Sequence, residues 1–127
     1  MKRTICIIAI FLFLISLGVI DLLVVNKTFN NMSKKVSALK QDIYQEESLE
    51  SIAQTAKEIE SYWIKNEKKL TIFLYYRDID VLGKQVDLVC ALLKNDDVEN
   101  AKTEILQLEY LLKSASKVYK FNFDNLL

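Results

Sequence analysis

An apolar segment near the start of the chain constrains its fold more than any other feature. Residues 4–20 carry no charged side chain, and the apolar character continues past Asp21 to Val25. At about 1.5 Å per residue, residues 4–25 form a helix of about 33 Å, which is enough to cross a hydrocarbon layer of about 30 Å. A soluble helix that is apolar on every side needs a large core around it, and the roughly one hundred residues that follow cannot supply one. The sequence therefore predicts a transmembrane anchor over residues 1–25.

A cleaved signal peptide is the alternative for this segment. Lys2 and Arg3 precede the apolar residues, and the small residues before Gly18 resemble a peptidase site. Cleavage near Gly18 would release a secreted helical protein. The apolar residues "VIDLLVV" at 19–25 follow without a break, which favours an anchor that is not cleaved.

The charges that flank the segment predict its orientation. Lys2 and Arg3 lie directly before the span, whereas the first lysine after it is Lys27. Because basic residues close to a span stay on the inner side, we expect residues 26–127 to be extracytoplasmic. Asp21 lies about one turn before the end of the span and is expected in the headgroup region; a buried partner contact inside the membrane is the alternative.

The composition excludes several classes of function. The formal net charge is zero, and charges of both signs alternate after residue 26, so no basic stripe indicates a nucleic-acid partner. Histidine is absent, which removes the commonest general base and metal ligand. No phosphate-binding loop or nucleophile motif is present. We therefore expect no enzyme, no cofactor and no metal, and we expect Cys6 and Cys90 to remain unpaired.

The remaining residues predict an all-α fold, in which the N-terminal transmembrane helix continues into a small antiparallel helical bundle over residues 26–127. Proline is absent and glycine occurs only at positions 18 and 83, so turn-dependent β folds are disfavoured. Apolar residues spaced three and four apart predict helices over residues 27–45, 48–64, 66–94 and 97–119, the first continuous with the span. These apolar positions are Phe29, Met32, Val36, Leu39 and Ile43; Leu49, Ile52, Ala56, Ile59 and Trp63; and Val98, Ala101, Ile105, Leu108, Leu112, Ala115 and Tyr119.

Helix-capping residues set the predicted boundaries. Ser48 is expected to cap the second helix and Asn66 the third. Asp96, with Glu99 three positions on, resembles a capping box at the start of the last helix. Lys94 suits the negative end of the helix before it.

Two aromatic-rich stretches do not follow a simple helical stripe. "LTIFLYY" at 70–76 either belongs to a central helix that is covered on several sides or forms a docking surface. "FNFDNLL" at 121–127 either packs along the bundle or binds a partner. In "YYRDIDVLGK" the Arg77–Asp80 and Asp80–Lys84 spacings predict surface ion pairs, and a catalytic or metal site shared with Glu104 is the weaker alternative. The candidate partner-contact residues are Trp63, Phe73, Tyr75, Tyr76, Arg77, Asp78, Asp80, Glu104 and Asn125.

These features occur in an order that resembles a known family. The anchor is followed by Trp63, by "YRDID" at 76–80, by "NDD" at 95–97 and by a terminal "NLL". This order resembles the small membrane-anchored proteins of Gram-positive bacteria described as domain of unknown function 4363. The family pattern has a histidine at the position of Tyr76 and another near Ser114, and neither is present here. Any family function that needs those imidazoles would be missing from this chain.

The resemblance implies a type of protein and a kind of partner, not a reaction. Family members are often encoded beside a multi-pass membrane protein, which implies a partner in the membrane. We therefore expect an accessory subunit that acts by protein–protein contact. A ligand-sensing extracytoplasmic bundle is the alternative, and self-association as a homodimer stays open, because such apolar stripes also form dimers.

Overall fold

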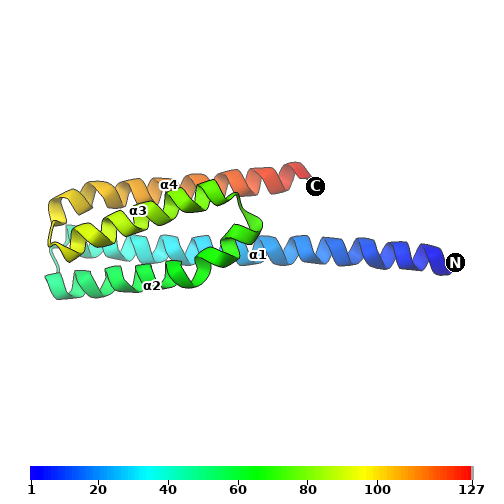
Figure 1. Cartoon of the computed structure of the whole chain (residues 1–127), viewed down its shortest axis with the longest axis horizontal. Coiled ribbons are helices and arrows are strands. Elements are labelled where there is room, and N and C mark those ends of the chain that lie inside the picture. The colour runs from blue at the N-terminus through cyan, green and yellow to red at the C-terminus, as the bar shows by residue number, and fades with distance from the viewer. Residues whose placement is uncertain (127) are drawn as a thin grey trace.

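The chain forms four α-helices joined by short connections (Figure 1). The structure is a computed structural model that describes the backbone of residues 1–126 and the side chains of residues 1–119. The helices are α1 (Lys2–Tyr44), α2 (Leu49–Phe73), α3 (Tyr76–Lys94) and α4 (Val98–Leu126). No strand occurs in this described part of the chain, and the predicted all-α class is confirmed.

The helices pack as an antiparallel four-helix bundle. α1 packs against α2 and α4, and α3 packs against the same two helices, so α1 and α3 lie diagonally opposite, as do α2 and α4. One end of the bundle holds the α2–α3 turn and is called the turn end. The other end holds the α1–α2 and α3–α4 connections and is called the loop end. The N-terminal part of α1 projects far beyond the turn end, and α4 also passes the turn in that direction (Figure 1).

The predicted apolar stripes form the core. All five predicted positions of α1, from Phe29 to Ile43, are at most 2% exposed. Ile105 and Leu108 of α4 are fully buried against them. Val98 and Ala115 are partly buried against this core, and Leu49 is 53% exposed because it begins α2 at the loop end.

α1 is continuous from the apolar segment into the core. Its residues 4–17 are exposed, and packing against other helices begins near Leu22 and Val25. Within the described residues, α1 is the one helix that is long and apolar enough to cross a membrane. Because α1 has no break between the two parts, the apolar segment and the bundle share one helix axis.

The predicted boundary at Asn66 is wrong. Asn66 lies inside α2, is 8% exposed, and its side-chain Nδ2 donates a hydrogen bond to the carbonyl of Tyr62 at 2.8 Å. The amide is therefore satisfied within the helix and does not cap a new one. The chain turns at Leu74 and Tyr75 instead, so residues 66–73 belong to α2 and not to α3.

Two of the predicted helix ends are confirmed and one is corrected. The Oγ of Ser48 accepts a hydrogen bond from the backbone N–H of Ser51 at 3.2 Å, and α3 ends at Lys94. At the start of α4, however, Asp97 and not Asp96 accepts from the backbone N–H of Asn100. Asp96 adopts a left-handed conformation (φ 57°) in the connection, and the predicted capping-box residue Glu99 pairs with Lys102.

The two cysteines are unpaired, as predicted. Cys6 is exposed on the apolar segment of α1, and Cys90 is buried in α3, where its thiol donates to the carbonyl of Ala56 at 3.6 Å.

Candidate functional site

The α2–α3 turn brings five of the candidate residues together. α2 ends at Phe73, Leu74 is extended, and Tyr75 precedes the first residue of α3. The backbone N–H of Leu74 still donates to the carbonyl of Leu70 at 2.8 Å, so the reversal is tight. Such a short connection leaves its side chains little room to pack inward. The residues that gather here are Phe73, Tyr75, Tyr76, Arg77 and Asp78.

Aromatic and charged side chains are exposed at this turn. Tyr75 and Tyr76 are 76% and 72% exposed, and the neighbouring Ile72 is 75% exposed. Arg77 and Asp78 are exposed as well, while Phe73 is half-buried. Residues 70–76 are thus divided: Leu70 is fully buried and Phe73 and Leu74 are half-buried, whereas Ile72, Tyr75 and Tyr76 are exposed. The exposed residues at the turn are called the turn surface, which we define as Ile72, Tyr75, Tyr76, Arg77 and Asp78.

A groove between α2 and α3 joins three of the predicted residues. It has a volume of about 550 Å³ and is lined by Trp63, Tyr76 and Asp80, among others. Asp80 forms an ion pair with Lys84 at 3.0 Å. The hydrogen bond from Lys84 to Asp80, together with the charge of that carboxylate, raises the pKa of Lys84. The ion pair predicted between Arg77 and Asp80 does not form among the described side chains.

Trp63 is part of the core beneath this groove. Its side chain is 2% exposed, so the ring does not share the accessible surface of Tyr76. The indole Nε1 is buried without a hydrogen-bond partner among the described residues. It lies against Gly83 of α3, where an added Cβ would be 3.1 Å from Nε1. The absence of a side chain at Gly83 is what admits the indole ring.

The remaining candidates do not join this site. Glu104 lies on α4, where its side-chain and backbone oxygens accept from the amide of Gln85 at 2.8 and 2.9 Å. The side chain of Asn125 and the aromatic residues of 121–127 lie outside the described side chains. In the described part of the chain, no three acidic or cysteine side chains gather in a way that could hold a metal ion.

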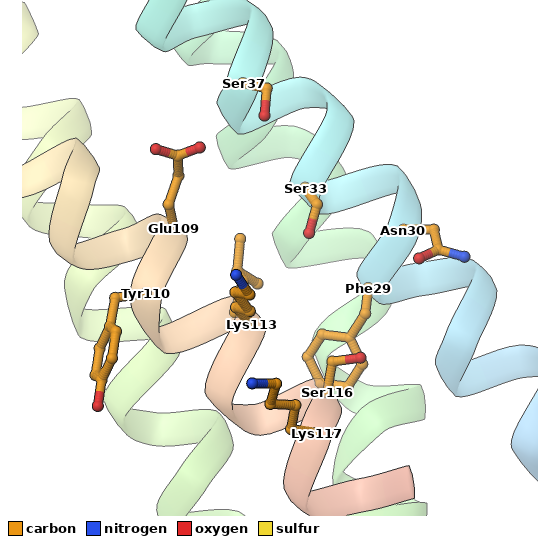
Figure 2. A pocket seen from close by; sticks show the side chains of 10 residues that line it. Phe29, Asn30, Ser33, Ser37, Glu109, Tyr110, Lys113, Ser116 and Lys117 are labelled. Carbon is orange, nitrogen blue, oxygen red and sulfur yellow. The ribbon is translucent and has the colours of Figure 1, made fainter.

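A second groove, between α1 and α4, was not predicted. Figure 2 shows Ser33 and Ser37 of α1 facing α4, where Lys113 and Ser116 line the opposite wall. Its volume is about 540 Å³. The serines on the two helices are small and lie outside the apolar stripes, and this is the signal in the sequence that could have indicated a depression.

A third cavity connects α1 to the turn. Asp21, Ile72, Tyr75 and Tyr119 line a space of about 370 Å³ at the turn end. The phenol of Tyr119 donates a hydrogen bond to the Oδ1 of Asp21 at 3.0 Å. Burial of Tyr119, followed by this hydrogen bond and the charge of Asp21, raises the pKa of the phenol, which therefore stays a neutral donor. Asp21 thus has a partner within the same chain, a role that sequence reasoning missed.

Comparison with known proteins agrees with this organisation. A family model described as "Domain of unknown function (DUF4363)" matches residues 19–126. The match covers the whole bundle and begins inside the apolar segment, at Val19. No curated protein and no solved structure matches the chain.

Proposed function

Because the chain belongs to the DUF4363 family, whose description assigns no activity, we propose a function from the geometry. The protein is a single-pass membrane protein whose extracytoplasmic bundle binds another membrane protein as an accessory subunit.

The dimensions of α1 support the anchor. From Lys2 to Asp21 the helix rises by about 29 Å, close to the thickness of a hydrocarbon layer. Large apolar side chains in this stretch, such as Phe11 and Phe13, are more than 60% exposed. A bilayer would cover them, and Lys2 and Asp21 would then lie at its two boundaries.

The unbroken passage of α1 from the apolar segment into the core is the observation that carries the proposal. A helix without a hinge holds the bundle at a fixed height above the bilayer. Asp21 and Tyr75 line the same cavity, so the turn surface lies level with the point where α1 leaves the membrane. The closeness of this surface to the bilayer supports a membrane protein as the partner.

The side chains of the turn surface are of the kinds that dominate protein interfaces. Tyrosine and arginine account for much of the binding energy in such contacts, and Tyr76 and Arg77 are exposed next to each other. Tyr76 also lines the α2–α3 groove above Trp63, so a partner side chain has a concave site beside the protruding ones.

The test is co-purification after crosslinking in intact cells. Hot-spot residues contribute about 2 kcal/mol each, which is about thirtyfold in affinity. The double variant Tyr76→Ala, Arg77→Ala is therefore expected to weaken partner capture several hundredfold. Tyr110→Ala is the matched control, because Tyr110 is also an exposed tyrosine (64%) but lies on α4. Unchanged capture by the double variant would exclude the turn surface as the contact.

The anchor is tested separately by the intact mass of the protein from membranes. The proposal expects a chain that retains residues 1–18 and resists extraction at alkaline pH. A mature chain that begins near Val19 and is recovered in the soluble fraction would identify a secreted bundle instead.

A further inference from the structure

The fold separates charges that alternate along the sequence. At the loop end, acidic residues predominate over the three lysines Lys40, Lys94 and Lys102; these acidic residues are Asp42, Glu46, Glu47, Glu50, Asp96, Asp97 and Glu99. At the turn end the balance is reversed. Cations lie on all four helices there: Lys27, Lys65, Lys68, Lys69, Arg77, Lys84, Lys113 and Lys117. A chain of zero net charge therefore folds into a bundle with one acidic and one basic end.

The turn end also carries four acidic residues, Asp21, Glu67, Asp78 and Asp80, half as many as its eight cations. Asp80 forms an ion pair with Lys84 at 3.0 Å, and Asp21 accepts a hydrogen bond from the Tyr119 phenol. By contrast, Lys27, Lys69 and Lys117 are exposed and form no ion pair with a described side chain. They project from α1, α2 and α4, so positive charge surrounds the end from several sides.

These lysines are close to the level at which α1 would leave a bilayer. Lys27 is six residues beyond Asp21 and Lys69 is five residues before Leu74, which places both about 9 Å or less from that level. Lys69, at about 7.5 Å, lies within the Debye length of about 8 Å at physiological salt, and Lys27, at about 9 Å, lies just beyond it. Exposed apolar side chains, Ile72 and Tyr75, lie at the α2–α3 turn, past which only α4 and the apolar part of α1 continue (Figure 1). An apolar and tyrosine-bearing turn with lysines close to it matches the two layers of a membrane surface, the acyl boundary and the headgroups.

From this arrangement we propose that the turn end binds anionic lipid headgroups. The lysines contact the headgroups, Ile72 and Tyr75 enter the interface, and the acidic loop end points away from the negatively charged surface. The lipid contact therefore fixes the bundle upright against the membrane, at the end where α1 emerges. The inference rests on the proposed anchor but needs no protein partner. Of the turn surface, the lipid contact uses Ile72 and Tyr75, which do not line the α2–α3 groove, and leaves Tyr76, Arg77 and that groove to the partner protein.

The test uses the full chain in nanodiscs of phosphatidylcholine, with or without phosphatidylglycerol. A nitroxide is attached at Ile72→Cys in a Cys6→Ser, Cys90→Ala background, and its accessibility to a water-soluble nickel chelate is measured. Leu49→Cys is the matched control, since Leu49 is an exposed apolar residue at the opposite end of α2. A label on the native Cys6 reports separately whether α1 is in the lipid, so failure of the anchor is distinguished from failure of the lipid contact.

We expect the label at position 72 to be protected in discs that contain phosphatidylglycerol and the label at position 49 to remain accessible in both. A triple variant tests the lysines; its substitutions are Lys27→Gln, Lys69→Gln and Lys117→Gln. We expect it to lower the ratio of docked to undocked turn ends roughly a hundredfold. A second triple variant is the control for net charge and removes three lysines of the loop end or the middle of the bundle: Lys34→Gln, Lys57→Gln and Lys94→Gln. We expect it to leave the protection of the label at position 72 unchanged. Equal accessibility at positions 72 and 49 in anionic discs, or equal protection in both lipids, would overturn the proposal.

Discussion

At the scale of single residues, Gly83 and Trp63 form a contact that a substitution can test. Glycine inside a helix normally costs about 1 kcal/mol relative to alanine, so Gly83→Ala would be stabilising if space allowed. A Cβ at this position would lie 3.1 Å from Nε1 of Trp63, whose ring is closely packed in the core. Overpacking of this kind costs about 1–3 kcal/mol, and we expect the variant to be destabilised by about 1 kcal/mol.

The measurement is thermal unfolding followed by the fluorescence of Trp63, the single tryptophan of the chain. Gly18→Ala is the matched control, because an added Cβ at Gly18 meets nothing within 4 Å. The control is expected to leave the fluorescence spectrum of Trp63 unchanged. A rise of the melting temperature in Gly83→Ala would show that the indole ring moves aside at little cost.

The thiol of Cys90 predicts a pH dependence of stability. Burial in the core, and then the charge of Glu60, raises the pKa of this thiol to about 11. The folded state therefore holds the proton more tightly than the unfolded state, whose thiol titrates near 9. Stability linked to Cys90 is complete below about pH 9 and is lost as the pH rises toward 11.

Denaturant unfolding at pH 8 and pH 10.5 measures this effect in comparison with Cys90→Ala. We expect the wild-type chain to lose more stability than the variant between the two pH values. In the same samples at pH 8, Cys90 should react with a maleimide only after unfolding, because the thiolate is the reactive form. Rapid labelling of the folded chain at Cys90 would contradict the burial of this side chain.

At the scale of helices, the Ser48 cap gives a prediction for the start of α2. Its Oγ accepts from the N–H of Ser51 at the loop end, and loss of such a cap costs about 1 kcal/mol. Ser48→Ala is expected to lower the free energy of unfolding by that amount. Ser51→Ala is the control, since the Ser51 side chain makes no such bond and alanine is the better helix former. Chemical denaturation of the two variants should therefore give changes of different size.

The helices themselves could be predicted from apolar spacing, but the reversal between α2 and α3 could not. Apolar positions continue at helical spacing through Asn66 to Leu70, and the Asn66 amide is satisfied inside the helix. The true turn at Leu74 and Tyr75 contains neither glycine nor proline, the usual residues of a reversal. The clustering of Tyr75, Tyr76 and Arg77 followed from their adjacency in sequence, whereas the burial of Trp63 depended on Gly83, which lies twenty residues away.

At the scale of the whole molecule, the polarity of the bundle depends on topology. Lys27, Lys69 and Lys117 are far apart in sequence, on three different helices. Antiparallel packing places the three at the same end, because the packed part of α1 begins there, α2 ends there and α4 runs toward it and past it. The order of charges along the sequence therefore predicts a neutral surface of mixed sign. The separation into an acidic and a basic end arises only when the helices pack together.

The hydrogen bond between Tyr119 and Asp21 couples the two ends of the chain, which are 98 positions apart. A bond to a charged acceptor contributes about 2 kcal/mol, and here it joins α4 to α1 where the apolar segment meets the core. Tyr119→Phe keeps the ring and removes the donor, so we expect the amides near residues 112–119 to exchange hydrogen about thirtyfold faster in lipid. Tyr110→Phe removes an exposed phenol and should leave that exchange unchanged.

Substitution of the acceptor separates the hydrogen bond from the charge. Asp21→Asn retains an oxygen that can accept from Tyr119, so its exchange rates should lie between those of the wild type and Tyr119→Phe. Asp21→Leu removes the acceptor, leaves the buried phenol without its partner, and should match or exceed the effect of Tyr119→Phe. If all three variants exchange at the wild-type rate, α1 and α4 are held together at this level by apolar packing alone, and Asp21 is placed there by the bilayer boundary and not by the bundle.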